Sequence, residues 1–333
     1  MSEKIFLRFF ILFTTLYVVI HLFTLDYFPL PWFDETYMAD IALSWRKDST
    51  FTRTVALHDS PPTQELIYGP VYFVLVGMWL KWIPFSLWGY RFFVLVAGLL
   101  VWILVCRMYW LEQRNIYQSI LFAILFALNP LFNRCLHEGR MDFIAIVFAL
   151  VSWLGLMLFQ RKERYAILYF WISSLAWGFS LLTTPRAAVI LLPICIWGVV
   201  RLRIQIMVIW MLLPIGMYTL WVLYAFGNVG NWWVYYQNKL AYTKLITPVW
   251  YVPRHEIPVV LLVGLALVSI ALHYKKIVFQ KDTFLSMLLG IVLFQVFVHD
   301  AGVYSVLILP HYYWILGVGF LSFTFCKKQN LQP

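Results

Sequence analysis

Residues 133–159 read NRCLHEGRMDFIAIVFALVSWLGLMLF. Two arginines, a histidine and two acids fall within residues 133–142, and 17 residues without a charge follow at 143–159. As a helix, the uncharged run would cover roughly 26 Å, which is close to the minimum for crossing a bilayer. A simple connector does not need charges this dense, although a local salt-bridge cluster would also explain them. The stretch therefore predicts a membrane helix that begins at a polar, functional mouth.

The same contrast recurs along the whole chain. Of its 333 residues, 63% are apolar and 12% are charged, about half the charged share of a soluble domain. This composition excludes a disordered chain, a disulfide-rich secreted scaffold and an ordinary cytosolic enzyme. We predict an all-α integral membrane protein with about ten transmembrane helices and external juxtamembrane or re-entrant helices after the first span. The apolar runs lie at about 5–25, 88–106, 117–133, 143–159, 165–182, 183–200, 204–226, 257–273, 283–298 and 303–325.

The short apolar segment between Pro70 and Pro84 decides the topology. Its 15 residues would form a helix of roughly 22 Å, against a hydrocarbon core of roughly 30 Å. If it does not cross, 14 of the 25 Lys and Arg residues lie inside, whereas only 10 do if it crosses. The positive-inside rule favours the first arrangement. We therefore predict a plasma or inner membrane protein whose termini are both cytoplasmic.

The net charge of +10 follows from this topology. The inner side carries 14 basic and four acidic residues, and the outer side carries 11 of each. The excess is a topological signal, so a nucleic-acid partner is not expected. Eleven carboxylates on the outer side suggest a functional surface there, although carboxylates are also merely tolerated outside.

We expect one polytopic membrane domain over residues 1–333, without a soluble C-terminal domain. Its first part, 1–200, would be the catalytic module and would contain the first external loop, 26–87. The remainder, 201–333, would hold the C-terminal spans and an external loop at 227–256. The aromatic residues of that later loop suit an interfacial belt, and one or two of them would be able to stack on a sugar.

Asp34 and Glu35 follow the first predicted span and precede apolar residues at helical spacing. We expect an amphipathic helix here, lying on the outer membrane surface. A carboxylate at that place can act as a general base or bind a cation, but Asp is equally suited to cap a helix N-terminus.

Three cationic or turn motifs lie at predicted outer mouths. Arg91 suits a lipid phosphate, although a snorkelling anchor explains it about as well. Arg186 lies in the turn Thr183-Thr184-Pro185-Arg186, and Tyr68 opens Tyr68-Gly69-Pro70-Val71-Tyr72. A plain turn is the simpler interpretation of each of these two motifs. His299, near the last predicted span, is a weaker candidate.

Taken together, these residues resemble the polytopic GT-C glycosyltransferases, in the branch of the protein O-mannosyltransferases and lipid A aminoarabinose transferases. The resemblance is carried by these motifs in order: Asp34-Glu35-Thr36-Tyr37-Met38-Ala39, Tyr68-Gly69-Pro70-Val71-Tyr72, Tyr90-Arg91-Phe92-Phe93, Arg140-Met141-Asp142 and, less sharply, Leu182-Thr183-Thr184-Pro185. It is strongest up to about residue 200. Where this chain has Thr184-Pro185-Arg186, the family often has a lysine in the turn.

The resemblance implies that a sugar moves from a polyprenyl-phosphate donor to an acceptor hydroxyl at the outer membrane face. Asp34 would be the general base, with Glu35 beside it and Asp142 as the acid before the fourth span. Arg91 would stabilise the leaving phosphate, with Arg186 a weaker candidate, and Arg140 would help to orient the sugar. The other implied substrate-binding residues are Glu138, Tyr68 and His299.

The expected partners are the polyprenyl-phosphate sugar, a glycolipid, glycan or protein acceptor, and membrane lipids. No pattern in the sequence requires a cofactor, but clustered carboxylates such as Asp34 and Glu35 are compatible with a divalent cation. The main alternative is a polytopic transporter or a flippase for lipid-linked sugars. It predicts ionisable residues near mid-membrane, whereas the charges here gather at the outer mouth. A non-catalytic membrane scaffold would leave the charged clusters unexplained.

Overall fold

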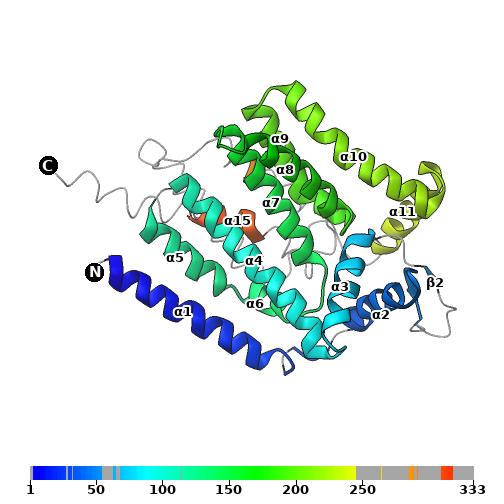
Figure 1. The fold of residues 1–333 in the computed structure, drawn as a ribbon, viewed down its shortest axis with the longest axis horizontal. Coiled ribbons are helices and arrows are strands. Elements are labelled where there is room, and N and C mark those ends of the chain that lie inside the picture. Colours follow the sequence, from blue (N-terminus) through cyan, green and yellow to red (C-terminus); the bar gives the residue numbers. More distant parts are fainter. Residues whose placement is uncertain are drawn as a thin grey trace.

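The described part of the chain forms a bundle of helices, with the short helices α2 and α3 beside the start of α4 (Figure 1). The computed structural model describes residues 3–244 except 28, 32, 55–62, 65–67 and 114, and then residues 264, 285–288, 291 and 309–317. In this part, the two-residue strands β1 (Thr52–Arg53) and β2 (Thr63–Gln64) pair antiparallel. The helices are α1 (Glu3–Thr24), α2 (Phe33–Asp48), α3 (Pro70–Trp82), α4 (Leu87–Gln113), α5 (Ile116–Ala127), α6 (Pro130–Leu136), α7 (Asp142–Gln160), α8 (Ala166–Leu181), the 3₁₀ turn η1 (Pro185–Ala187), α9 (Ala188–Arg201), α10 (Ile204–Phe226), α11 (Val229–Lys244) and α15 (Leu309–Leu316).

Four of the described helices, α1, α4, α7 and α10, are long and apolar enough to cross a membrane. The pair α5 and α6 would make a fifth span that bends by 64° where Asn129 caps α6 and Pro130 opens it. The runs expected at 165–182 and 183–200 correspond to the shorter helices α8 and α9. The last three expected runs lie mostly outside the described residues. The chain is an integral membrane protein, and the count of ten spans stays a prediction.

Two hydrogen bonds fix the directions of α1, α4 and α7. The last turn of α1 meets the first turn of α4, because Trp88 Nε1 donates to the Leu22 carbonyl at 3.3 Å. At the opposite end, Arg161 after α7 donates to the Leu111 carbonyl near the end of α4, at 2.9 Å. Both α4 and α7 therefore start at the end of the bundle where α1 finishes. We call this end, with the α6–α7 turn and the end of α8, the site end.

The chain between α1 and α4 leaves and returns at the site end, so α3 does not carry it across the bundle. Within this excursion, α2 packs on α3 and its apolar stripe is buried there, with Met38, Ile41 and Ala42 inside. The contact is close, since a Cβ at Gly77 of α3 would meet the ring of Trp45. The stripe covers α3, because α3 is too short to span and offers an apolar face beside α2. The expected place of α2 on the outer membrane surface stays a prediction.

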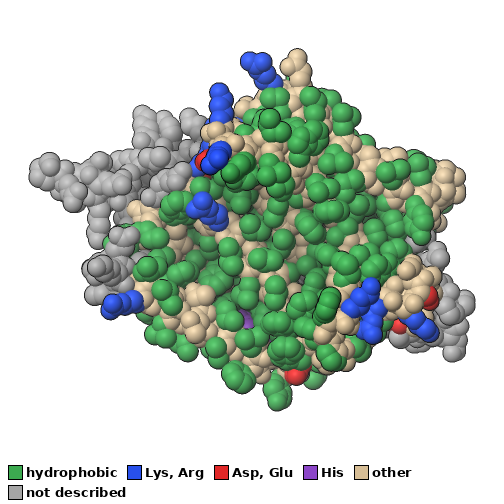
Figure 2. Space-filling view, in the orientation of Figure 1, with side chains coloured by type: hydrophobic (Ala, Val, Ile, Leu, Met, Phe, Trp, Pro, Cys, Tyr) green, Lys and Arg blue, Asp and Glu red, His purple; other side chains and the backbone are tan. Residues whose placement is uncertain are grey.

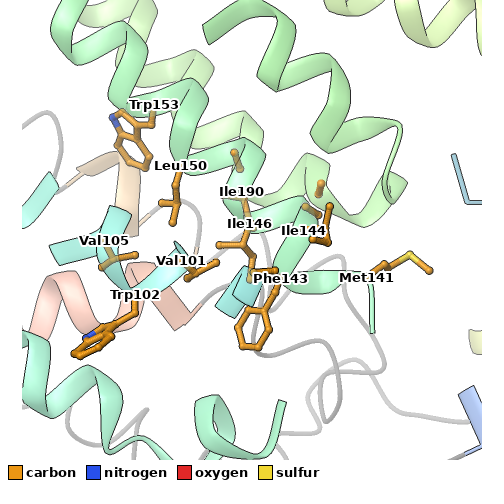
Figure 3. Packing of buried hydrophobic residues seen from close by; sticks show 14 of the residues in the cluster. Val101, Trp102, Val105, Met141, Phe143, Ile144, Ile146, Leu150, Trp153 and Ile190 are labelled. Atoms are coloured by element: carbon orange, nitrogen blue, oxygen red, sulfur yellow. The ribbon is translucent and has the colours of Figure 1, made fainter. Parts of the chain in front are cut away.

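The core that positions the site lies between α4, α7 and α9. Val101 of α4 lies beside Phe143 and Ile146 of α7, and Ile190 of α9 closes the group (Figure 3). The next residue, Trp102, points away from α7 toward α5, where its Nε1 donates to the Ala123 carbonyl at 2.9 Å. These residues are almost completely buried. The outer surface of the bundle is apolar instead of polar, and Lys and Arg gather at its margins (Figure 2). This inside-and-outside apolar pattern is typical of helices that face both protein and lipid.

Part of the loop expected at 227–256 is the helix α11. Gly227, with φ 74°, ends α10, and the side chain of Asn228 accepts from the Asn231 amide at 2.8 Å to start the next helix. Trp232 and Tyr236 stack one turn apart on α11, with ring centroids 5.6 Å apart. Several of the aromatic residues that suggested an interfacial belt therefore lie on a regular helix. The sequence predicted a loop here and not a helix. The rest of that loop lies outside the described residues.

Candidate active site

Glu35 and Arg91 form a fully buried, two-pronged ion pair at the site end. Arg91 Nε donates to Glu35 Oε1 at 2.9 Å and Arg91 Nη2 donates to Oε2 at 2.8 Å. The remaining terminal nitrogen, Nη1, donates to the Leu25 carbonyl at 2.8 Å. Relative exposure is 0% for Arg91 and 2% for Glu35. This geometry ties α4 to the start of α2 and to the end of α1. Both residues were predicted site residues, and their pairing supports a positioning role better than direct contact with a phosphate.

The same carboxylate reaches the turn between α6 and α7. Glu35 Oε1 also accepts from the Gly139 amide at 2.7 Å. The turn is tight, because the Arg140 amide donates to the Glu138 carbonyl two residues back, at 2.7 Å. A side chain at 139 is excluded, since a Cβ there would overlap the ring of Tyr90. We call residues 138–142, which end at the first residue of α7, the Gly139 turn.

Two tyrosines contact the other side of the same peptide group. The Tyr90 hydroxyl donates to the Gly139 carbonyl at 2.6 Å, the Tyr72 hydroxyl lies 2.9 Å from that carbonyl, and the two hydroxyls are 2.7 Å apart. Tyr72 comes from α3 and Tyr90 from α4, so three separate segments meet at one glycine. Burial raises the pKa of the Tyr72 hydroxyl, which keeps it protonated and able to donate.

The Gly139 turn carries the predicted polar side chains in pairs. Arg140 Nε donates to Asp142 Oδ2 at 2.8 Å, and both residues are buried. Arg134 Nε donates to Glu138 Oε1 at 2.7 Å, with Arg134 exposed and Glu138 buried. Burial raises the pKa of Glu138, while Arg134 opposes that shift. Glu138, Arg140 and Asp142 are therefore brought together with Glu35 and Arg91.

Two further predicted motifs also meet at this end. The turn before α3 packs on the end of α8, where the Val71 amide donates to the Leu182 carbonyl at 3.2 Å. A Cβ at Gly69 would overlap that same Leu182 backbone, so the close approach needs glycine. Tyr68 is half-buried before this glycine, and Arg186 is half-buried in η1, four residues after Leu182.

Two predicted site residues, Asp34 and His299, lie partly or wholly outside the described residues. The backbone of Asp34 lies in the first turn of α2, next to Glu35, but its side chain lies outside what the structure describes. His299 lies outside the described residues altogether. In the described part, no three His, Cys, Asp or Glu side chains are placed to hold a metal ion. The divalent cation considered from the sequence stays a prediction that the structure leaves untested.

Sequence reasoning missed a second polar cluster, on α1. His21 Nδ1 lies 2.6 Å from His137 Nε2, and the Asn133 side-chain oxygen lies 3.2 Å from His21 Nε2. Tyr17 donates to that same oxygen at 2.6 Å. A histidine inside a predicted span was the available signal, because ionisable groups there are costly unless partnered. Tyr72 and Tyr90 were also missed, although both stood in quoted motifs.

Comparison with known proteins gives structural neighbours but no sequence relatives. No protein-family model and no curated protein matches the chain. The crystal structure of ArnT from Cupriavidus metallidurans in the apo state is similar, with a TM-score of 0.62 and 14% identity over 93% of this chain and 59% of that protein. ArnT from the same organism bound to undecaprenyl phosphate has a TM-score of 0.66 and 14% identity over 96% of this chain and 62% of that protein. The chain thus spans about three fifths of the length of these neighbours. Their likeness confirms the expected fold: the chain has a GT-C-like membrane fold of the kind found in ArnT.

Proposed function

We propose that this protein is a glycosyltransferase that moves a sugar from a polyprenyl-phosphate donor to an acceptor hydroxyl at the extracytoplasmic membrane face. One observation carries the proposal: the buried acids and arginines gather at one end of a fold shared with a protein that binds undecaprenyl phosphate. A lipid-linked donor places its phosphate and sugar at a membrane surface. Charged groups at the mouth of the bundle meet such a head group where it lies.

The proposed chemistry is a single displacement at the anomeric carbon. The acceptor oxygen attacks that carbon and gives its proton to Asp34, while the bond from the carbon to the phosphate oxygen breaks. The polyprenyl phosphate leaves with the bonding electrons as an anion. It needs cationic stabilisation instead of a proton, and Arg186 and Arg140 are the proposed source.

The proposed division of labour follows the contacts. Each guanidinium nitrogen of Arg91 donates to Glu35 or to the Leu25 carbonyl, so we assign the pair a positioning role beside Asp34. Asp142 and Glu138 belong to the Gly139 turn and would face the sugar with Arg140. Tyr68 precedes the turn that packs on the end of α8. Arg186 follows that end of α8 by a few residues. His299 stays a predicted substrate residue.

The test compares surface glycolipids and glycoproteins by mass spectrometry in cells with the chain, without it and with Asp34→Asn. We expect one sugar modification to require the chain, and Asp34→Asn to lower it roughly 100-fold or more, as for the loss of a general base. Asp48→Asn is the matched control. Asp48 ends the same helix, is exposed and accepts only from Thr50 among the hydrogen bonds that the structure gives it.

Full activity of Asp34→Asn would show that another group takes the proton. If proteoliposomes of the purified protein flip a lipid-linked sugar but transfer none, the protein is a flippase and the proposal fails. Equal losses in Asp34→Asn and Asp48→Asn would instead point to a general defect of α2 and remove the support for Asp34.

A further inference from the structure

The Gly139 carbonyl and the two tyrosine hydroxyls make more close contacts than their hydrogens can fill. Tyr72 and Tyr90 carry one hydroxyl hydrogen each, yet three oxygen–oxygen contacts of 2.6 to 2.9 Å join the two hydroxyls and the carbonyl. Two hydrogens can fill only two of the three contacts. Either both hydroxyls donate to the carbonyl, or one donates to it and the other donates to its neighbour.

We propose that Tyr72 and Tyr90 form a redundant clamp that positions the Gly139 turn for the sugar transfer proposed above. In the shortest arrangement, Tyr72 donates to the Tyr90 oxygen and Tyr90 donates to the carbonyl at 2.6 Å. If Tyr90 loses its hydroxyl, Tyr72 is already 2.9 Å from the same carbonyl and takes its place. The carbonyl is left without either donor only when both hydroxyls are gone.

The clamp is completed from the amide side by Glu35. Its Oε1 accepts from the Gly139 amide, so one peptide group is held at its nitrogen by α2 and at its oxygen by α3 and α4. Because Gly139 has no side chain, the ring of Tyr90 can approach the backbone directly. The turn that carries Glu138, Arg140 and Asp142 is therefore fixed relative to the first turn of α2, which carries Asp34.

The inference rests on the proposed function for its catalytic meaning but on geometry alone for the clamp. Tyr72 and Tyr90 are thus positioning residues, since their hydroxyls contact the turn and not a reacting atom. Their loss should slow turnover and leave the binding of the donor lipid almost unchanged. Their effects should also be more than additive, because each hydroxyl covers for the other.

The experiment uses the full chain, purified in nanodiscs, as wild type, Tyr72→Phe, Tyr90→Phe and the double variant. Hydrogen–deuterium exchange is followed in peptides covering residues 136–142. We expect each single variant to raise exchange less than about twofold, and the double variant to raise it by roughly tenfold or more, because the buried carbonyl then lacks a partner. Ser180→Ala is the matched control, since it removes a buried hydrogen bond of 2.8 Å to the Ala145 carbonyl of α7 but does not touch Gly139.

Binding of undecaprenyl phosphate and the cellular sugar modification are measured on the same variants. Support requires affinity within about threefold of wild type in all variants, with modification lost mainly in the double variant. Exchange in the double variant equal to the product of the single effects would overturn the clamp, as would the same exchange increase in Ser180→Ala.

The two proposals fail separately. Cooperative exchange in a wild-type background that transfers no sugar would overturn the proposed function and leave the clamp as a structural fact. Sugar transfer without cooperative exchange would overturn the clamp and leave the function standing.

Discussion

Two of the buried polar regions that join helices of this bundle differ in kind. The first is the Gly139 turn with the Glu35–Arg91 pair, which is charged and joins distant segments of the chain. The second is a serine seam between α7, α8 and α10. There, Ser173 donates to the Ser152 carbonyl at 2.5 Å, Trp210 Nε1 donates to the Ser173 hydroxyl at 3.0 Å, and Ser174 donates to the Trp210 carbonyl at 2.5 Å.

The seam shows that these helices can be joined by neutral hydroxyls alone. Such bonds are worth little each, but they leave no buried charge to stabilise. The charged region costs more free energy to bury, because its charges must leave water. Removing either partner of a buried ion pair is strongly destabilising. Since neutral groups suffice for packing elsewhere in the same bundle, the charges at the site end are best explained by function. Four predictions can break or sharpen this contrast.

The largest effect is expected for Arg91→Ala. It leaves the buried Glu35 carboxylate without its cation and should lower the free energy of unfolding by about 3–5 kcal/mol. The measurement is thermal or denaturant unfolding in detergent. The double variant Glu35→Gln with Arg91→Met removes both charges and should recover most of that loss. A loss below about 1 kcal/mol for Arg91→Ala, the range of exposed ion pairs, would show that the pair is solvated.

The next effect concerns Gly139→Ala, which should destabilise the protein by about 1–3 kcal/mol through overpacking against Tyr90. Gly216→Ala is its control, because a Cβ there meets nothing within 4 Å on α10. The control should be neutral or stabilising by up to about 1 kcal/mol, as expected for a helix interior. Unfolding midpoints of the two variants decide the matter, and equal midpoints would contradict the close packing at Gly139.

Within the serine seam, Ser173→Ala should cost about 1 kcal/mol. It removes the donor to the Ser152 carbonyl and the acceptor for Trp210. The sugar modification should stay at the wild-type level when corrected for the amount of folded protein. A large loss of activity with little loss of stability would mean that the seam is also functional, and the contrast between the two regions would fall.

The smallest effect is a pH dependence at Glu138. Burial raises the pKa of this carboxyl in the folded state above its unfolded value of 4.5, so the folded form holds the proton more tightly. Its contribution is fully present below the unfolded pKa and is lost as pH rises through the folded pKa. Glu138→Gln has no proton to lose, so its stability relative to wild type should improve as pH rises above about 4.5. Unfolding temperatures of both proteins over a pH series test this, and parallel curves would contradict the burial of an ionisable Glu138.

The sequence carried the membrane class and much of the local structure, because these follow from composition and short-range pattern. The apolar runs predicted α1, α4, α7 and α10. The prolines at 70 and 84 bounded the short helix α3, which lies between two chain segments that meet at the site end. The pairing of Glu35 with Arg91 was beyond that reach, since the partners are 56 residues apart and nothing local selects one over another. The packing of Gly69 on Leu182 is similar, for a glycine in a turn does not say what approaches it.

The candidate site followed the same division. Charge density at span mouths picked out Glu138, Arg140 and Asp142, which the structure does bring together. It did not reveal that hydroxyls complete the arrangement, because Tyr72 and Tyr90 look like ordinary aromatics in apolar runs.

The contacts of α1 also have a consequence for the order of biogenesis. Tyr17 and His21 lie in α1, yet their partners Asn133 and His137 come 112 to 116 residues later in the chain. At about 5–20 residues per second, α1 waits roughly 6–23 seconds in the bilayer before it can be matched. For that interval its polar side chains must be shielded by the insertion machinery or by water at the membrane surface. The polar contacts of α1 can therefore close only after α6 has been synthesised, although α4 already contacts its last turn.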